Sequence, residues 1–114
     1  MKVLEVELED IDLLELEVAE KVERAVKKIE ETEKNISSVT TSLSEKIKEQ
    51  CNIIFDFFND IWGEGTDKKV FGNKTNLGEC YKAYTQVLDN FHIQKENLSK
   101  TLDKYSNARI NRRS

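Results

Sequence analysis

Residues 42–62 read SLSEKIKEQCNIIFDFFNDIW and predict the helix around which the rest of the chain packs. Ser42 and Glu45 match a capping box, in which the serine hydroxyl accepts a hydrogen bond from a helix amide and the glutamate reaches back to another. Gly63 follows the segment, and glycine at this position adopts the positive φ that ends many helices. The sequence therefore predicts a helix over residues 43–62.

The apolar residues of this helix cover more than one of its faces. Most of them share an arc of about 120° at 100° per residue. They are Ile47, Cys51, Ile54, Phe55, Phe58, Ile61 and Trp62. Ile53 and Phe57 extend the apolar surface by roughly another 80°. The helix therefore either lies centrally with neighbours on two sides or presents an apolar strip to a partner, and Trp62 is either a lid on the core or a partner anchor.

Helical patterns lie on both sides of this segment. Apolar residues at helical spacing predict a helix with a narrow apolar stripe over residues 15–35, and one short helical turn is expected over 66–71. A last helix is predicted over 77–105, where apolar residues follow heptad spacing that only Lys95 interrupts. This helix would be about 43 Å long, whereas a compact domain of this size is about 35 Å across. Its end should project from the body or pack against another chain.

The composition supports a helical fold. The 114 residues include no proline, and all four glycines lie between Gly63 and Gly78. The rest of the chain lacks the two strongest helix breakers, which argues against a β-sandwich or barrel. We expect a mainly α fold: one small helical bundle over residues 1–105, with a long C-terminal helix and a flexible basic tail over 106–114.

The N-terminus carries the only strong β signal. Residues 3–8 alternate in polarity, with Leu4, Val6 and Leu8 on one face, as in a half-buried strand. A strand needs a partner, so either residues 10–14 fold back as a short hairpin or the edge pairs with another molecule. The alternative is that this acidic stretch begins the first helix.

Charge is distributed unevenly along the chain. Residues 1–20 contain eight acids against Lys2 alone, whereas residues 104–114 contain four bases and no acid. The basic end is too short to indicate a nucleic-acid partner. The complementary ends could attract each other within one chain or between neighbouring copies, and the second alternative would give a homo-oligomer. No apolar run reaches membrane-spanning length and the N-terminus lacks a signal-peptide pattern, so we expect a cytoplasmic protein without a membrane partner.

Side chains suited to catalysis or metal binding are sparse. His92 is the only histidine, and its place at the edge of the last helix's apolar stripe predicts that it caps the core. Cys51 and Cys80 are interpreted as reduced, buried residues. These residues form no zinc-ligand pattern, and no EF-hand, HExxH or dinucleotide-binding motif is present. We expect no enzymatic activity, no metal and no cofactor.

Several short motifs in the second half form a recognisable set. They are SEKI at 44–47, QC at 50–51, FDFF at 55–58, WGEGT at 62–66, FG at 71–72, TNL at 75–77 and KYSNARINRR at 104–113. In this set the chain resembles the tail assembly chaperones and their relatives, small proteins encoded in the tail-morphogenesis regions of long-tailed phages and prophages of Gram-positive bacteria. The family's ending includes a proline that this chain lacks.

The resemblance implies a non-enzymatic protein that binds the apolar tape measure protein, the tail tube protein or both during tail morphogenesis. It implies action in the host cytoplasm and absence from the mature virion. The candidate partner-binding residues are Ile53, Phe57, Trp62, Phe71, Tyr105, Arg109, Arg112 and Arg113. One alternative is a phage-encoded inhibitor or trigger of a host defence factor that acts through the acidic face from Glu5 to Glu20. Another is a structural module that oligomerises through the heptads of residues 77–105.

Overall fold

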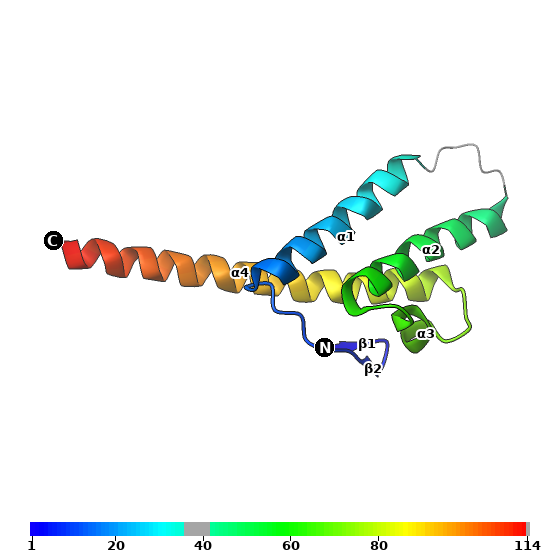
Figure 1. The fold of residues 1–114 in the computed structure, drawn as a ribbon, viewed down its shortest axis with the longest axis horizontal. Helices are drawn as coiled ribbons and strands as arrows, with labels where there is room; N and C mark the ends of the chain where they lie inside the picture. Colours follow the sequence, from blue (N-terminus) through cyan, green and yellow to red (C-terminus); the bar gives the residue numbers. More distant parts are fainter. Residues whose placement is uncertain (36–41, 114) are drawn as a thin grey trace.

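The computed structural model describes residues 1–35 and 42–113, and within them it is mainly helical (Figure 1). A two-stranded antiparallel hairpin precedes four helices in this part of the chain. The elements are β1 (Lys2–Val3), β2 (Val6–Glu7), α1 (Leu16–Asn35), α2 (Leu43–Trp62), α3 (Thr66–Phe71) and α4 (Leu77–Arg113). The expected fold class, a helical bundle with a short N-terminal β element, is confirmed.

Local capping sets the limits of α2. The Ser42 hydroxyl accepts a hydrogen bond of 3.4 Å from the Glu45 amide at the start of the helix. At the other end Gly63 has a φ of 109° and donates its amide to the Asn59 carbonyl at 2.9 Å. Both end groups match the sequence signals, because a cap depends only on residues a few positions apart.

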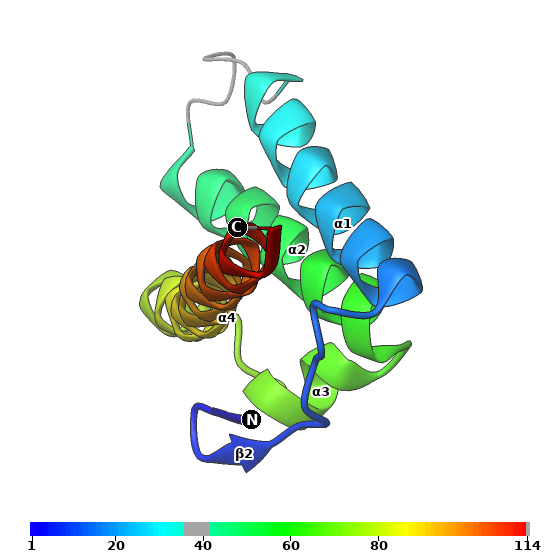
Figure 2. The ribbon, with the colours of Figure 1, turned by 90° about the vertical axis from the view of Figure 1, so that its left-hand side faces the viewer.

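Helix α2 is the central element of the bundle. It lies between α1 and α4 and packs against both, as the view along α4 shows (Figure 2). Phe57 is 1% exposed, and its ring centroid lies 5.0 Å from that of Tyr84 on α4. On the α1 side, Ile53 and Phe57 line a cavity of about 30 Å³ together with Ala25 and Ile29. The wide apolar surface of α2 is therefore covered by two neighbouring helices.

Helix α3 closes one end of the core. Its Val70 and Phe71 are buried, and the Phe71 ring lies 5.1 Å from Phe55 and 5.5 Å from Phe58. Gly72 then ends the helix with a φ of 64°, a backbone conformation that glycine adopts without strain. The glycines near the end of α2 thus serve a tight, packed corner between α2 and α4.

The N-terminal hairpin is tighter than the strand predicted over residues 3–8, and the correction has a clear cause. The chain reverses at Leu4 and Glu5, whose φ angles of 46° and 67° are typical of a two-residue hairpin turn. The paired residues are Lys2 with Glu7 and Val3 with Val6. The partner strand therefore lies within the predicted strand and not in residues 10–14. Val3 and Leu8 enter the core, while Leu4 and Val6 are only half-buried.

Helix α4 is longer than predicted. It continues to Arg113, whereas the sequence predicted an end at Tyr105 followed by a tail. No glycine or proline follows Gly78, so the chain offers no strong stop signal. Its 37 residues correspond to about 55 Å. The molecule accordingly measures 66 × 31 × 22 Å, with the C-terminal part of α4 projecting beyond the other elements (Figure 1).

Candidate functional site

An apolar groove lies between α1 and α4, close to the start of α1. Its volume is about 620 Å³, within the range of protein ligand sites. The apolar lining consists of Leu13, Leu14, Ala19, Val22, Val26 and Leu98. The polar lining consists of Glu23, Lys27, Glu30, Gln94 and Lys95. We call this feature the α1–α4 groove.

Gln94 on α4 fixes the chain segment at one end of the groove. Its carbonyl oxygen accepts a hydrogen bond of 3.0 Å from the Leu13 amide. Its side-chain nitrogen donates to the Ile11 carbonyl at 2.8 Å and to Asn90 Oδ1 at 2.7 Å. One partly buried side chain thus provides hydrogen-bond partners for both an amide and a carbonyl of a segment without regular secondary structure. Backbone groups in such a segment need these partners because no helix or sheet supplies them. Gln94 positions Leu13 and Leu14 beside α4.

Two further side chains hold residues 1–14, which we call the N-terminal segment. The Leu4 amide donates to Gln86 Oε1 on α4 at 3.0 Å. Trp62 at the end of α2 donates its indole N–H to the Glu9 carbonyl at 2.8 Å. Together with Gln94 these contacts attach the segment to α2 and α4 along its length.

The apolar stripe of α1 supplies the apolar residues on the α1 side of the groove. Val22, Ala25 and Ile29 are buried in the core, and Val22 also lines the groove beside the half-buried Val26. An ion pair of 3.2 Å between Lys28 and Asp60 connects α1 to α2. The stripe is therefore shared between the core and the groove.

Lys95 explains where the groove begins on α4. It is the one residue that interrupts the heptad series of this helix, and it lines the groove with Leu98. The buried residues of α4 are Cys80, Ala83, Val87 and Phe91, of which only Phe91 belongs to the heptad series, and Tyr81 of that series is 43% exposed. No described residue of α4 after Phe91 is buried. The interruption therefore marks the point where α4 leaves the body.

Three of the candidate partner-binding residues belong to the core. Ile53, Phe57 and Phe71 are 9%, 1% and 6% exposed. In this conformation α1, α3 and α4 cover the faces of α2 on which they pack, so these three residues can bind a partner only if the bundle opens to expose them. Of the two interpretations of α2, the central helix is the correct one.

The remaining candidates lie apart from one another. Trp62 is half-buried, stacks on Phe58 at 5.5 Å and holds the N-terminal segment, so it acts as a lid on the core. Tyr105 is 65% exposed on the projecting part of α4. Three other candidates have side chains outside the described part of the structure: Arg109, Arg112 and Arg113.

The residues considered for chemistry are dispersed. His92 is exposed and lies 3.0 Å from Glu96 on the same helix, so the expectation that it caps the core is wrong. Cys51 and Cys80 are fully buried. Within residues 1–35 and 42–113 no cluster of three His, Cys, Asp or Glu residues is placed to hold a metal ion. None of the helices in the described ranges is both long and apolar enough to cross a membrane.

The groove residues were not identified from the sequence. Leu13 and Leu14 are adjacent apolar residues that the alternation of residues 3–8 does not include, and Leu98 was simply one member of the heptad series. The one sequence signal for the groove is Lys95, a charged residue at a position of the heptad series that is otherwise apolar. This charge predicts a boundary of the core, but it does not predict which segment lies opposite.

The fold and the groove describe a small, mainly helical protein with an open apolar groove on a highly charged chain. The chain belongs to DUF6673, a family of unknown function, whose model matches residues 4–114. No match was found among curated proteins or among solved structures.

Proposed function

We propose that this protein is a non-enzymatic phage tail assembly chaperone that binds the tape measure protein, the tail tube protein or both during tail morphogenesis. The α1–α4 groove carries the proposal, because its apolar floor between two helices suits an amphipathic helix of a client. The sequence motifs shared with tail assembly chaperones support the same assignment. The protein acts in the host cytoplasm and does not remain in the mature virion.

The chemistry of the groove indicates the kind of client segment. Leucine, valine and alanine side chains form most of its surface, and two acids and two lysines accompany them. A client helix with one apolar face and mixed charges beside it would bury the apolar lining and satisfy the charged groups. Tape measure proteins, as long apolar clients, would offer such helices repeatedly.

Co-expression with the tape measure and tail tube proteins of a phage or prophage that carries this gene, followed by pull-down, tests the proposal. Leu14→Glu is the informative variant, because Leu14 lines the groove and is 69% exposed, so the charge leaves the fold intact. Leu16→Glu is the matched control, since Leu16 is 74% exposed and lies outside the groove lining. We expect the wild type and Leu16→Glu to retain a client and Leu14→Glu to lose it. Failure of the wild type to retain either protein contradicts the proposal.

A second candidate function uses a different surface. All eight acids between Glu5 and Glu20 are exposed, which supports an inhibitor or trigger of a host defence factor that docks through this acidic face. The position of the gene separates the two functions. A chaperone gene is expected just upstream of a very long tape measure gene, whereas an inhibitor gene is expected among unrelated small genes.

A further inference from the structure

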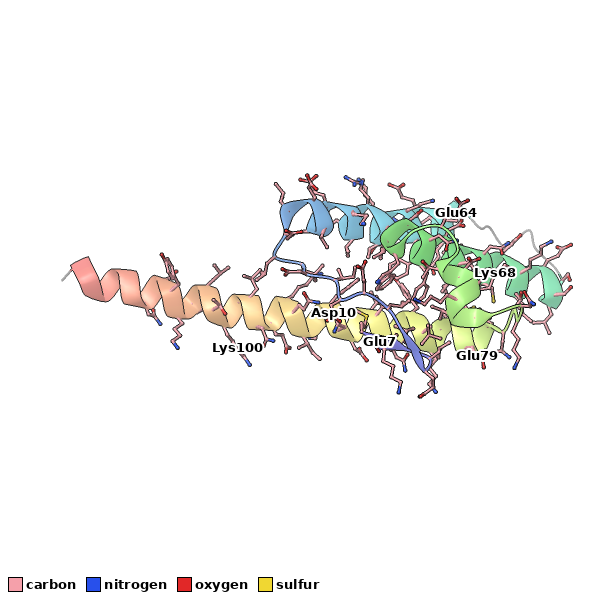
Figure 3. The ribbon with its side chains drawn as sticks, turned by 60° about the horizontal axis from the view of Figure 1, so that its bottom comes forward. Glu7, Asp10, Glu64, Lys68, Glu79 and Lys100 are labelled. Atoms are coloured by element: carbon pink, nitrogen blue, oxygen red, sulfur yellow. The ribbon has the colours of Figure 1, made fainter. Side chains whose placement is uncertain are left out.

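The C-terminal part of α4 has no partner within the described chain. We call residues 98–113 the arm. Every described residue from Ser99 to Asn107 is exposed. Lys100, at the start of the arm, extends away from the other elements (Figure 3). About four helical turns therefore stand clear of the body.

The arm nevertheless carries an apolar stripe. Leu98, Leu102 and Tyr105 are separated by steps of four and three residues, which places them on one face of the helix. Leu102 is 55% exposed and Tyr105 is 65% exposed. Isolated helices of this length are marginal in water, and most helical stability comes from packing an apolar face. The arm thus has the pattern of a helix that packs against another surface.

The stripe and the α1–α4 groove form one continuous surface. Leu98 lines the groove and also begins the stripe. A two-fold axis between Leu98 and Leu102 would therefore place the arm of each copy over the groove of the other. Both contacts are identical, as a closed dimer requires. Leu102 and Tyr105 of one copy then face the apolar lining of the second.

The charges favour the same arrangement. From Lys100 to Arg113 the arm carries five bases against Asp103. Residues 9–20, which lead into α1 beside the groove, carry six acids and no base, and all six acids are exposed. Complementary charges of this kind select partner and orientation.

We propose that two copies of this protein exchange their arms, each arm lying antiparallel to α4 of the other copy in its α1–α4 groove. The dimer does not depend on the chaperone function. One consequence does rest on that proposed function: a client helix and the arm take the same groove, so client binding competes with arm exchange.

Light scattering coupled to size-exclusion chromatography tests the dimer with single substitutions in the full chain. Leu102→Glu introduces a charge on the stripe, and Asn107→Glu introduces the same charge on the opposite face of the arm. Both positions are exposed, and circular dichroism checks the helix content. We expect wild type and Asn107→Glu to be dimers at micromolar concentration. We expect the dissociation constant of the Leu102→Glu dimer to be at least about 100-fold higher. A monomeric wild type, or a dimer that Leu102→Glu leaves unchanged, overturns the proposal.

Spin labels at position 107 test the antiparallel geometry. The native cysteines are fully buried, so Asn107→Cys provides one accessible site per copy. Residue 107 faces away from the contact in either arrangement. Exchange about an axis between Leu98 and Leu102 separates the two Cα atoms of residue 107 by about 25 Å, whereas parallel arms in register would bring these atoms to about 15 Å. The shorter distance, or open head-to-tail chains, overturns arm exchange. A monomeric wild type that still retains a client refutes only this inference. A dimeric wild type that retains no client refutes only the chaperone function.

Discussion

Gln94→Ala should loosen the N-terminal segment and weaken the whole fold. The substitution removes the hydrogen bonds of Gln94 to Leu13, Ile11 and Asn90, the first two of which hold the segment at the groove. At about 1 kcal/mol for each of the two backbone contacts, the loss is about 2 kcal/mol. The better helix propensity of alanine returns a few tenths of a kcal/mol. We expect a net fall of about 1.5 kcal/mol in the free energy of unfolding.

Urea denaturation measures this fall, which corresponds to a midpoint lower by about 1 M at an m-value near 1.5 kcal/mol/M. Asn97→Ala is the control, because Asn97 is an exposed amide three residues further along α4 and should change stability by less than about 0.5 kcal/mol. Hydrogen exchange should also show faster exchange of the Leu13 amide in Gln94→Ala. Equal midpoints for the two variants, or an unchanged Leu13 amide, would refute the reasoning.

Three other predictions concern the core. Phe57→Ala should destabilise the fold by about 3–5 kcal/mol because its ring is 1% exposed, whereas Tyr105→Ala should change the free energy of unfolding of the monomeric Leu102→Glu background by less than about 0.5 kcal/mol, both measured by urea denaturation. Trp62→Phe keeps an aromatic ring at this position but loses the bond to the Glu9 carbonyl, and urea titration should show a cost of about 1 kcal/mol. Burial, with the Cys51 thiol beside it, raises the pKa of Cys80 from 9.0 to about 12. The native state therefore retains a proton that the unfolded chain releases above pH 9. The contribution of Cys80 to the free energy of unfolding should be constant below pH 9 and decrease from pH 9 to 12. Rapid modification of native Cys80 by an alkylating reagent at pH 9 would contradict this.

The helices were predictable because their signals are local. The serine cap and the terminal glycine of α2 act over three or four residues, and α3 likewise ends at a glycine, Gly72. The position of each helix within the fold is harder to predict from the sequence. The width of the apolar surface of α2 left a central helix and a partner strip both open, and only the packing of Ile53 and Phe57 against α1 and α4 distinguishes them.

The candidate site was not predictable in the same way. Gln94 contacts residues 81 and 83 positions away in the chain, and such a contact leaves no periodicity in the sequence. The polarity alternates without interruption through Leu4 and Glu5, where the backbone turns, so the pattern alone predicts one strand and not a hairpin. The polar and basic composition after Tyr105 indicates a tail, but it contains no strong stop signal, so α4 continues beyond the predicted end.

The central claim is that the α1–α4 groove receives an apolar helix of a tail protein. Hydrogen–deuterium exchange of the Leu102→Glu variant, in which no arm is expected to occupy the groove, tests the claim directly when it is measured with and without a tape measure protein from a phage or prophage that carries this gene. The account predicts slower exchange on binding in α1 and in residues 94–98, which border the groove. Unchanged exchange in these regions, or protection restricted to the acidic residues 5–12, would contradict it.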